Sequence, residues 1–566
     1  MRRKAVLGLI PVCALLTGAV AYGKKQAADA KLFSQKLSKT QQIEQALNRL
    51  TFGPRPGDAA EVARIGLKKW IDQQLHPASI AENPKLDQKL QFMDSLSMSS
   101  AEMVRNYPSP QLVKAMVAGR EPFPTDPERR RMIEKQVAKA ETKQGDKATA
   151  TPPALPKLDE LLTREQIRTL RTGSSEQRRG VLKAVPPEKL DEVIAALPAG
   201  ARQNLFAGAP PELRRKIEMT AAPQQIVARD LSEAKVLRAI YSNRQVEAVL
   251  DDFWFNHFNV FLDKGADRYL VTQYERDTIR PHVLGKFRDF LDATAKSPAM
   301  LFYLDNWQSV GPNAPQRGNQ KKGARGLNEN YGRELLELHT LGVDGGYTQK
   351  DVTEVARCFT GWTIADPQRG GTFTFNKRLH DAGEKTVLGV KIPAGGGMED
   401  GEKVLDIVAH HPSTARFLSR KLAQRFVADN PPDSLVAKMA ETFQKSDGDL
   451  RAVMQTMLAS QEFWSVGAYQ SKVKTPLETV ASAVRAVNGD VDYAFPLVNQ
   501  IAQLGQPLYR KQEPTGYSNS SQEWLNSAGL LARMNFAVQL SKNQIPGVKV
   551  ESADASILGA PAFQKK

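Results

Sequence analysis

The residues best suited to chemistry in this sequence are a few histidines and acids that fall on predicted helices. When residues 328–341 are projected as a helix at about 100° per residue, Glu334 and Glu337 lie on a polar face together with Arg333. Two neighbouring carboxylates that face a cleft could bind a ligand or serve as a general base, and Arg333 is a candidate binding residue beside them. The alternative is a solvated ladder of alternating charges, which only supports the helix.

The run Glu-Leu-Leu-Glu-Leu-His resembles a metal-binding motif, but its spacing argues against one. His339 projects about 140–160° around the helix from Glu334 and Glu337, so one helix cannot aim all three side chains at one ion. The His-Glu-x-x-His spacing is absent as well. We therefore predict no metal site here, and the sequence identifies no cofactor. A histidine on an apolar face is typically a core residue whose ring bonds to a backbone carbonyl.

A second candidate region is the predicted helix at 243–262, which is apolar around nearly its whole circumference. Such a helix is expected to be buried. Asp252, Asn256 and Asn259 leave one polar stripe, which must meet water, a partner or a binding site, so Asp252 and Asn256 are candidate binding residues. His257 projects into the apolar arc next to this stripe. It is either a core histidine or part of a site.

His380 and Asp381 form the third candidate, because they lie in the connection between two predicted β segments, 372–376 and 385–392. We expect these segments to pair as a hairpin. A His-Asp pair on a loop is the least core-like arrangement of a histidine in this chain. A catalytic centre would have to gather side chains from separate elements, and convergence in one cleft is its test. The candidates are His257, His339, His380, Asp381, Glu334 and Glu337.

The elements that must position these side chains are mostly helices. The sequence predicts a mainly α fold, a large multi-helix domain with a small β-hairpin near 370–392 and an inserted α-hairpin repeat segment. The repeat has a period of about 23–24 residues, and short helical repeats of this kind usually mediate contacts. The predicted divisions are an N-terminal helical part of the core at 39–118, a charged, proline-rich linker at 119–160, the helical repeats at 161–221 and the main helical domain at 222–566.

Local helix signals are clear at several places. The stretch 39–53 is predicted to be an amphipathic helix, and 59–75 a second, continuous one. Gly342 is placed to end the predicted helix at 328–341. Thr348 and Asp351 form the pattern of a capping box, which predicts that another helix begins there.

The compartment and the class of partner follow from the charge and the first residues. The chain of 566 residues carries a formal net charge of +16, which attracts nucleic acid, anionic lipid and anionic cell-wall polymer. No zinc-finger, RNP or helix-turn-helix signature is present, so nucleic acid is not expected. Three basic residues at 2–4, an apolar run at 5–20 and a small-x-small site ending at Ala21 predict a signal peptide at 1–21. The protein is therefore expected to be exported, to the periplasm or the extracellular space.

Several stretches together resemble a large bacterial family of exported proteins, the domain-of-unknown-function family numbered 1800. They are LNRLTFGPRPGD from Leu47, FWFNHFNVF from Phe253, RPHVLGKFRDFLDATAKSPAMLFYLDN from Arg280, NENYGRELLELHTLGVDGGYTQKDVTEVARCFTGW from Asn328, HPSTARFLSRKLAQRFV from His411, LGQPLY from Leu504 and PTGYSNSSQEWLN from Pro514. The resemblance covers Thr40 onward except for about 119–221. It implies an exported bacterial protein, and an exported sulfatase-like protein from a neighbouring gene as an expected partner. It implies no reaction, cofactor or catalytic residue.

Two functional hypotheses follow. The first is an accessory or scaffold protein of the cell envelope that binds an anionic polymer or a partner protein through its basic surface and repeats. The alternative is a secreted hydrolase or a metal-dependent enzyme with a site of His, Glu and Asp side chains. The first is favoured by the charge and by the lack of a nucleophile elbow, a metal motif or a phosphate loop.

Overall fold

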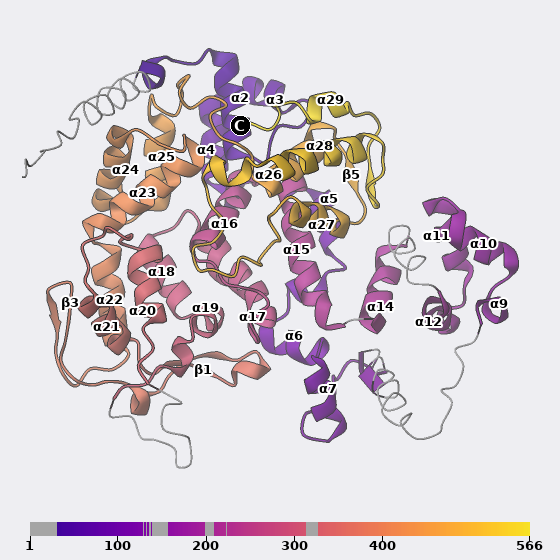
Figure 1. Cartoon of the computed structure of the whole chain (residues 1–566), viewed down its shortest axis with the longest axis horizontal. Helices are drawn as coiled ribbons and strands as arrows, with labels where there is room; N and C mark the ends of the chain where they lie inside the picture. Colours follow the sequence, from indigo (N-terminus) through magenta and orange to yellow (C-terminus); the bar gives the residue numbers. More distant parts are fainter. Residues whose placement is uncertain are drawn as a thin grey trace, which may run out of the picture.

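The computed structural model of the chain is mainly helical (Figure 1). It describes residues 31–127, 129–131, 133, 134, 137, 157–197, 209–221, 223–312 and 326–566. The predicted signal peptide lies outside these ranges. Within them, no helix is both long enough and apolar enough to cross a membrane. The predicted fold class, mainly α with a small β-hairpin, is confirmed.

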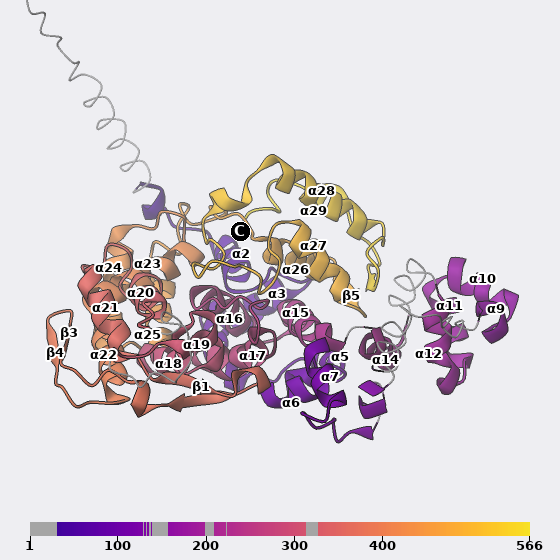
Figure 2. The ribbon, with the colours of Figure 1, turned by 60° about the horizontal axis from the view of Figure 1, so that its bottom comes forward.

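Two long helices form the centre of the molecule, α15 (Pro223–Tyr241) and α16 (Gln245–His257). In both views the helices α20–α25 lie to the left of α16, and α26–α29 lie above α15 (Figures 1 and 2). The predicted burial of the second central helix is confirmed. Trp254 is fully buried, with ring centroids 4.9 Å from Phe253 and 5.4 Å from Phe290. A helix that is apolar on all sides can satisfy its whole surface only at such a central position.

The N-terminal helices pack against this centre. The predicted amphipathic helix is α2 (Lys39–Leu50), which Ser38 caps. The predicted helix at 59–75 is wrong in one respect, because Gly66 adopts φ +93 and divides it in two. A positive φ cannot continue a right-handed helix. The helices of this part are α3 (Asp58–Ile65), α4 (Leu67–Leu75), α5 (Pro84–Leu90), α6 (Ser100–Asn106) and α7 (Pro110–Val117).

The stretch 328–341, predicted to be one helix, is not a regular α-helix throughout. α20 (Asn330–Glu334) passes directly into a π-helical turn, Leu335–His339. A π turn places residues five apart on one face, so the angular projection used for an α-helix fails beyond Glu334. The capping box at Thr348 is confirmed, and α21 (Gln349–Cys358) begins there.

The remaining helices of the main domain follow the chain around the centre. They are α17 (Asp267–Gln273), which passes into a π turn at Tyr274–Ile279, α18 (Phe287–Ala295), α19 (Pro298–Tyr303), α22 (Glu399–Ala409), α23 (Pro412–Phe426), α24 (Asp433–Lys445), α25 (Leu450–Ala459), α26 (Pro476–Ala486), α27 (Phe495–Gln503), α28 (Ser527–Ser541) and α29 (Ala555–Leu558).

Three small antiparallel sheets of two strands occur in the described ranges. β1 (Trp362–Ala365) pairs with β2 (Thr372–Phe375), β3 (Lys385–Val387) with β4 (Val390–Ile392), and β5 (Asp490–Val491) with β6 (Val548–Lys549).

The expected pairing of 372–376 with 385–392 is wrong. A tight turn at Leu388 and Gly389, with φ values of 49 and 80, closes the second segment on itself. Two positive φ values in succession define a type I′ hairpin turn, and Leu-Gly is not the sequence by which such turns are usually recognised.

Residues 157–197 of the insertion lie apart from the main body in both views (Figures 1 and 2). Its short helices bury a small apolar core of their own around Leu170, Leu182 and Val193, at the place predicted for the α-hairpin repeats. In the stretch predicted to be a linker, the described residues from 127 to 137 are helical and 138–156 lie outside the described residues. The helices of the insertion are α9 (Leu158–Leu161), α10 (Arg164–Thr172), α11 (Ser175–Ala184), α12 (Pro187–Ala196) and α14 (Pro211–Ala221).

Candidate binding site

A polar cavity of about 450 Å³ opens where the end of α16 meets α23 and the loop 511–523. This size is within the range of small-molecule sites. Most of its lining is polar, with amides, hydroxyls, two lysines and two carboxylates. The lining residues are Asn256, His257, Lys421, Gln424, Asp429, Lys511, Thr515, Gly516, Tyr517, Ser518, Asn519, Ser520 and Glu523.

Two charged groups of this cavity, Lys421 and Glu523, have no ion pair or hydrogen bond among the described residues, and Lys421 is the less exposed of the two. Its Nζ lies 5.3 Å from the centroid of the Phe417 ring and makes no hydrogen bond or ion pair with any residue that the structure describes. Desolvation of the Lys421 amine lowers its pKa from 10.5 to about 8. The second lysine, Lys511, is paired with Glu513 at 3.1 Å. An unpaired ammonium on a cavity wall is a ready partner for an anion.

Two histidines lie together beneath the cavity. The rings of His257 and His339 have centroids 6.2 Å apart, and both residues are buried. His257 Nε2 lies 3.0 Å from the carbonyl oxygen of His339, which assigns the proton to Nε2 and the lone pair to Nδ1. Burial, with a contribution from Lys421, lowers the pKa of His339 to about 3 and that of His257 well below its usual value. Both rings are therefore neutral near neutral pH.

The loop over the cavity is clamped by the polar stripe of α16. Asn256 Oδ1 accepts a hydrogen bond from Tyr517 N at 3.1 Å, and Asn259 Nδ2 donates to the carbonyls of Lys511 and Glu513 at 2.9 and 3.0 Å. The stripe therefore meets a loop that forms a site wall. Asp252 takes no part, because its carboxylate lies 3.6 Å from Lys235 Nζ in a buried ion network.

Gly516 is the closest approach between this loop and α16. It adopts φ +67, and an added Cβ would lie 2.0 Å from the carbonyl oxygen of Asn256. We expect Gly516→Ala to lower the free energy of unfolding by about 1–3 kcal/mol and to displace the loop, because both the strain and the clash must be relieved. Thermal unfolding and protease cleavage within 511–523 would measure this.

The matched control is Gly505→Ala, which also has a positive φ, +103, but meets no atom within 4 Å. It should show the cost of strain alone and leave cleavage within 511–523 unchanged. Equal cleavage of this loop in both variants would contradict the role assigned to Gly516.

His380 and Asp381 belong to a different part of the structure and do not line the cavity. They are 8% and 5% exposed, so they are not the exposed loop pair that the sequence suggested. His380 Nδ1 lies 2.8 Å from the Thr360 carbonyl and Nε2 lies 3.1 Å from Asp400. Asp381 accepts a hydrogen bond from Arg357 Nε at 2.7 Å. Since all these groups are satisfied, the network fixes the connection between the two hairpins.

Glu334 and Glu337, the two candidate acids of the stretch 328–341, also lie outside the cavity lining. Burial and the neighbouring Glu337 raise the pKa of Glu334 to about 7. Arg333 pairs with Glu329 at 3.4 Å, which is the solvated ladder of the alternative interpretation. The six candidates therefore do not converge in one cleft, and only His257 and His339 come together. Lys421 and the loop were not predicted, because a lysine on an amphipathic helix carries no signal that distinguishes it from a solvated one.

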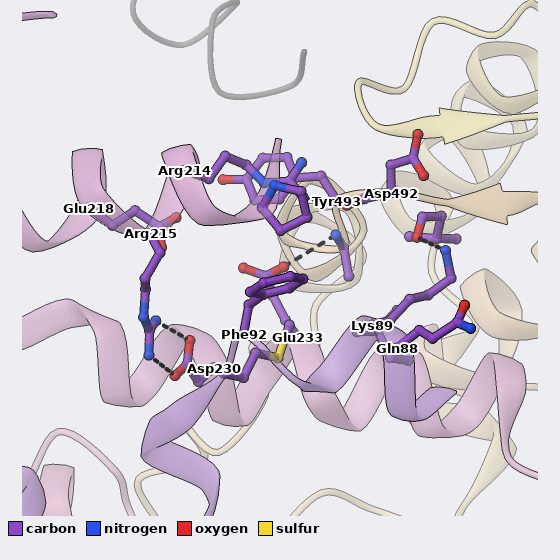
Figure 3. Close-up of a pocket in the computed structure, with 15 residues that line it drawn as sticks. Gln88, Lys89, Phe92, Arg214, Arg215, Glu218, Asp230, Glu233, Asp492 and Tyr493 are labelled. Carbon is purple, nitrogen blue, oxygen red and sulfur yellow. Dashed lines mark hydrogen bonds and ion pairs between the residues drawn. The ribbon is translucent and has the colours of Figure 1, made fainter. Parts of the chain in front are cut away.

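A smaller hollow of about 130 Å³ lies where α14 meets the main body (Figure 3). Arg215 points toward Asp230, with Nη1 2.7 Å from Oδ1, and Arg214 lies over the Tyr493 ring at 4.8 Å. Glu233 accepts a backbone hydrogen bond at 3.2 Å, and burial raises its pKa to about 8. Because these charges are already engaged, we assign this hollow to the attachment of the insertion.

Within the described residues, no group of three or more His, Cys, Asp and Glu side chains is arranged to hold a metal ion. No curated protein matches the chain, and no solved structure matches it. A family model described as "Protein of unknown function (DUF1800)" matches residues 45–564, which is nearly the whole length and includes the insertion. The chain therefore belongs to the DUF1800 family, as the resemblance predicted.

Proposed function

We propose that this is an exported bacterial envelope protein that binds an anionic polymer, and that the cavity around Lys421 takes one anionic, hydroxyl-bearing unit of it. The observation that carries the proposal is the amine of Lys421, which stands at a polar cavity of about 450 Å³ without an ion-pair partner among the described residues. Desolvating an ammonium without pairing it is unfavourable. A carboxylate, sulfate or phosphate of the ligand would supply the missing partner.

The remaining lining suits a ligand rich in hydroxyl groups. The side chains of Asn519 and Ser520 make no hydrogen bond within the described part of the chain, and Ser518 Oγ only accepts one, from Ser520 N at 3.0 Å. These groups can both donate and accept. Tyr517, half-buried and 6.1 Å from Trp524, adds an aromatic wall. A sugar unit that carries an acid matches this set better than a purely apolar ligand does.

The charge of the whole chain favours a polymer over an isolated unit. A formal net charge of +16 raises the local concentration of a polyanion around the protein. Contacts outside the cavity would then add to the affinity in a manner that salt weakens.

A hydrolase is the second candidate, and the pair His257 and His339 is the observation that favours it. Among the described residues, His257 Nδ1 and His339 Nε2 are buried without a hydrogen-bond partner. However, a pKa of about 3 makes His339 a weak base near neutral pH, and the pKa of His257 is also far below its usual value. Binding therefore ranks above catalysis at this cavity.

The test is equilibrium binding of a uronic-acid polymer, with dextran as the neutral control. We expect the acidic polymer alone to bind, with an affinity that falls as the pH rises above about 8, because Lys421 then loses its proton. In Lys421→Met the binding should be lost, and with it this pH dependence. Equal binding of both polymers, or an unchanged pH profile in the variant, would contradict the proposal.

A further inference from the structure

A second cavity lies among α5, α15, α16 and the π turn at 274–279. Its volume is about 300 Å³, at the small end of the range for ligand sites. The residues that line it are Phe52, Glu82, Leu86, Asp87, Leu90, Lys235, Arg238, Ala239, Ser242, Arg244, Glu247, Ala248, Asp251, Glu275 and Arg280.

Two half-buried charges of opposite sign stand in this cavity without a partner. Arg238 on α15 and Glu247 on α16 make no hydrogen bond and no ion pair with any described residue, including each other. Burial lowers the pKa of Arg238 to about 10 and raises the pKa of Glu247. The charges of Arg238 and Glu247 are therefore incompletely compensated, although each group could form an ion pair with a charge of opposite sign.

Two neighbouring charges, Glu82 and Arg280, differ because they are already engaged. Glu82 accepts hydrogen bonds from Ser242 Oγ and Asn243 N, each at 2.8 Å. Arg280 pairs with Glu275 at 3.1 Å. The fork of Arg238 and the carboxylate of Glu247 are thus the half-buried groups that remain available to a ligand.

The cavity is lined by charges of both signs, and its two half-buried unpartnered groups, Arg238 and Glu247, are one of each sign. Its cations are Lys235, Arg238, Arg244 and Arg280, and its carboxyl groups are Glu82, Asp87, Glu247, Asp251 and Glu275. Burial, reinforced by Glu275, raises the pKa of Asp251 well above its usual value. Four cationic residues and five carboxyl groups therefore line the cavity. An anion could pair with Arg238 alone and a cation with Glu247 alone, whereas a ligand that carries both charges can pair with both.

We propose that this cavity binds a small zwitterion, an α-amino acid with a short apolar side chain. Its carboxylate lies on the guanidinium of Arg238 in a two-point contact, and its ammonium lies on Glu247. The apolar wall of Phe52, Leu86 and Leu90 takes the side chain. This inference does not depend on the proposed polymer site, because the two cavities are lined by different residues.

The test is calorimetric titration of the mature protein with alanine. Acetate and methylammonium, each with half of the charge pair, are the comparison ligands. We expect saturable binding of alanine only, weakened by at least about tenfold in both Arg238→Gln and Glu247→Gln. Arg238→Lys, which keeps the charge and loses the fork, should show an intermediate loss and covers the case in which Arg238→Gln folds poorly.

Two controls separate this cavity from the rest of the molecule. Arg333→Gln removes a cation from the exposed ladder of α20 and should leave alanine binding unchanged. Lys421→Met should also leave it unchanged, so that the two binding sites fail independently. Absence of saturable alanine binding, equal binding of acetate, or full affinity in folded Arg238→Gln and Glu247→Gln would each overturn the inference.

Discussion

Replacing Glu478 with glutamine should lower the free energy of unfolding by about 3–5 kcal/mol, one of the largest effects expected from removing a single charge here. Glu478 is buried, and its carboxylate bonds to both Arg425 and Lys566. Arg49 and Lys474 lie close enough to add to the same field. Glutamine has nearly the same shape but no charge, so the variant would leave buried cations without their common counter-ion.

The pH dependence of the same group has a definite sign. Burial alone would raise the pKa of Glu478, but Arg425 and Lys566 hold it well below the usual value of 4.5. A carboxyl group with a lowered pKa in the folded state stabilises the protein above its unfolded pKa, and this contribution is lost as the pH falls further. The wild-type protein should therefore lose stability below about pH 4.5, and Glu478→Gln should lose less over the same interval.

Chemical unfolding near neutral pH and at acid pH would measure both effects. Glu441→Gln is the matched control, because Glu441 is exposed and has one partner, Lys445. A loss in Glu478→Gln no larger than in this control would mean that the buried cations find other compensation.

The features that the sequence could predict depend on local order. The capping box of Thr348 and Asp351 needs only residues three apart, and it is present. The burial of α16 follows from its own composition, and with it the position of His257. The contact of Asn256 with the loop 511–523 also follows, because a polar stripe on a buried helix must meet something polar.

The features that the sequence could not predict depend on segments that lie far apart along the chain. Whether β2 pairs with the strand before it or after it is decided by turns and packing, not by the strand itself. The π turn at Leu335–His339 depends on a shift of one residue in the hydrogen bonds, which an apolar pattern does not record. His380 looked exposed because Asp400, its partner, lies twenty positions along the chain.

Lys421 is the clearest case of a residue whose role depends on distant segments of the chain. It supports the second large prediction. Replacing Lys421 with methionine should stabilise the folded protein by about 1–2 kcal/mol while it removes the binding of the acidic polymer. The methionine side chain fills a similar volume without a charge to desolvate. A gain in stability together with a loss of binding is characteristic of residues that are kept for function.

The linkage for Lys421 again has a definite sign. Because the folded state lowers the pKa from 10.5 to about 8, the unfolded chain holds more protons between these values, and wild-type stability should rise with pH there. Lys421→Met lacks this rise, so the two stability curves should approach each other near pH 10.5. Denaturant unfolding at a series of pH values would show it.

Lys445→Met is the matched control, because Lys445 is exposed and paired with Glu441 at 2.5 Å. It should change neither polymer binding nor the slope of stability against pH. A Lys421→Met protein that is less stable than wild type and still binds the acidic polymer would identify Lys421 as a structural residue, whose stem packs on Phe417 and whose charge the solvent satisfies. The combination of greater stability and lost binding has no such structural explanation, because a residue kept only for packing does not cost stability.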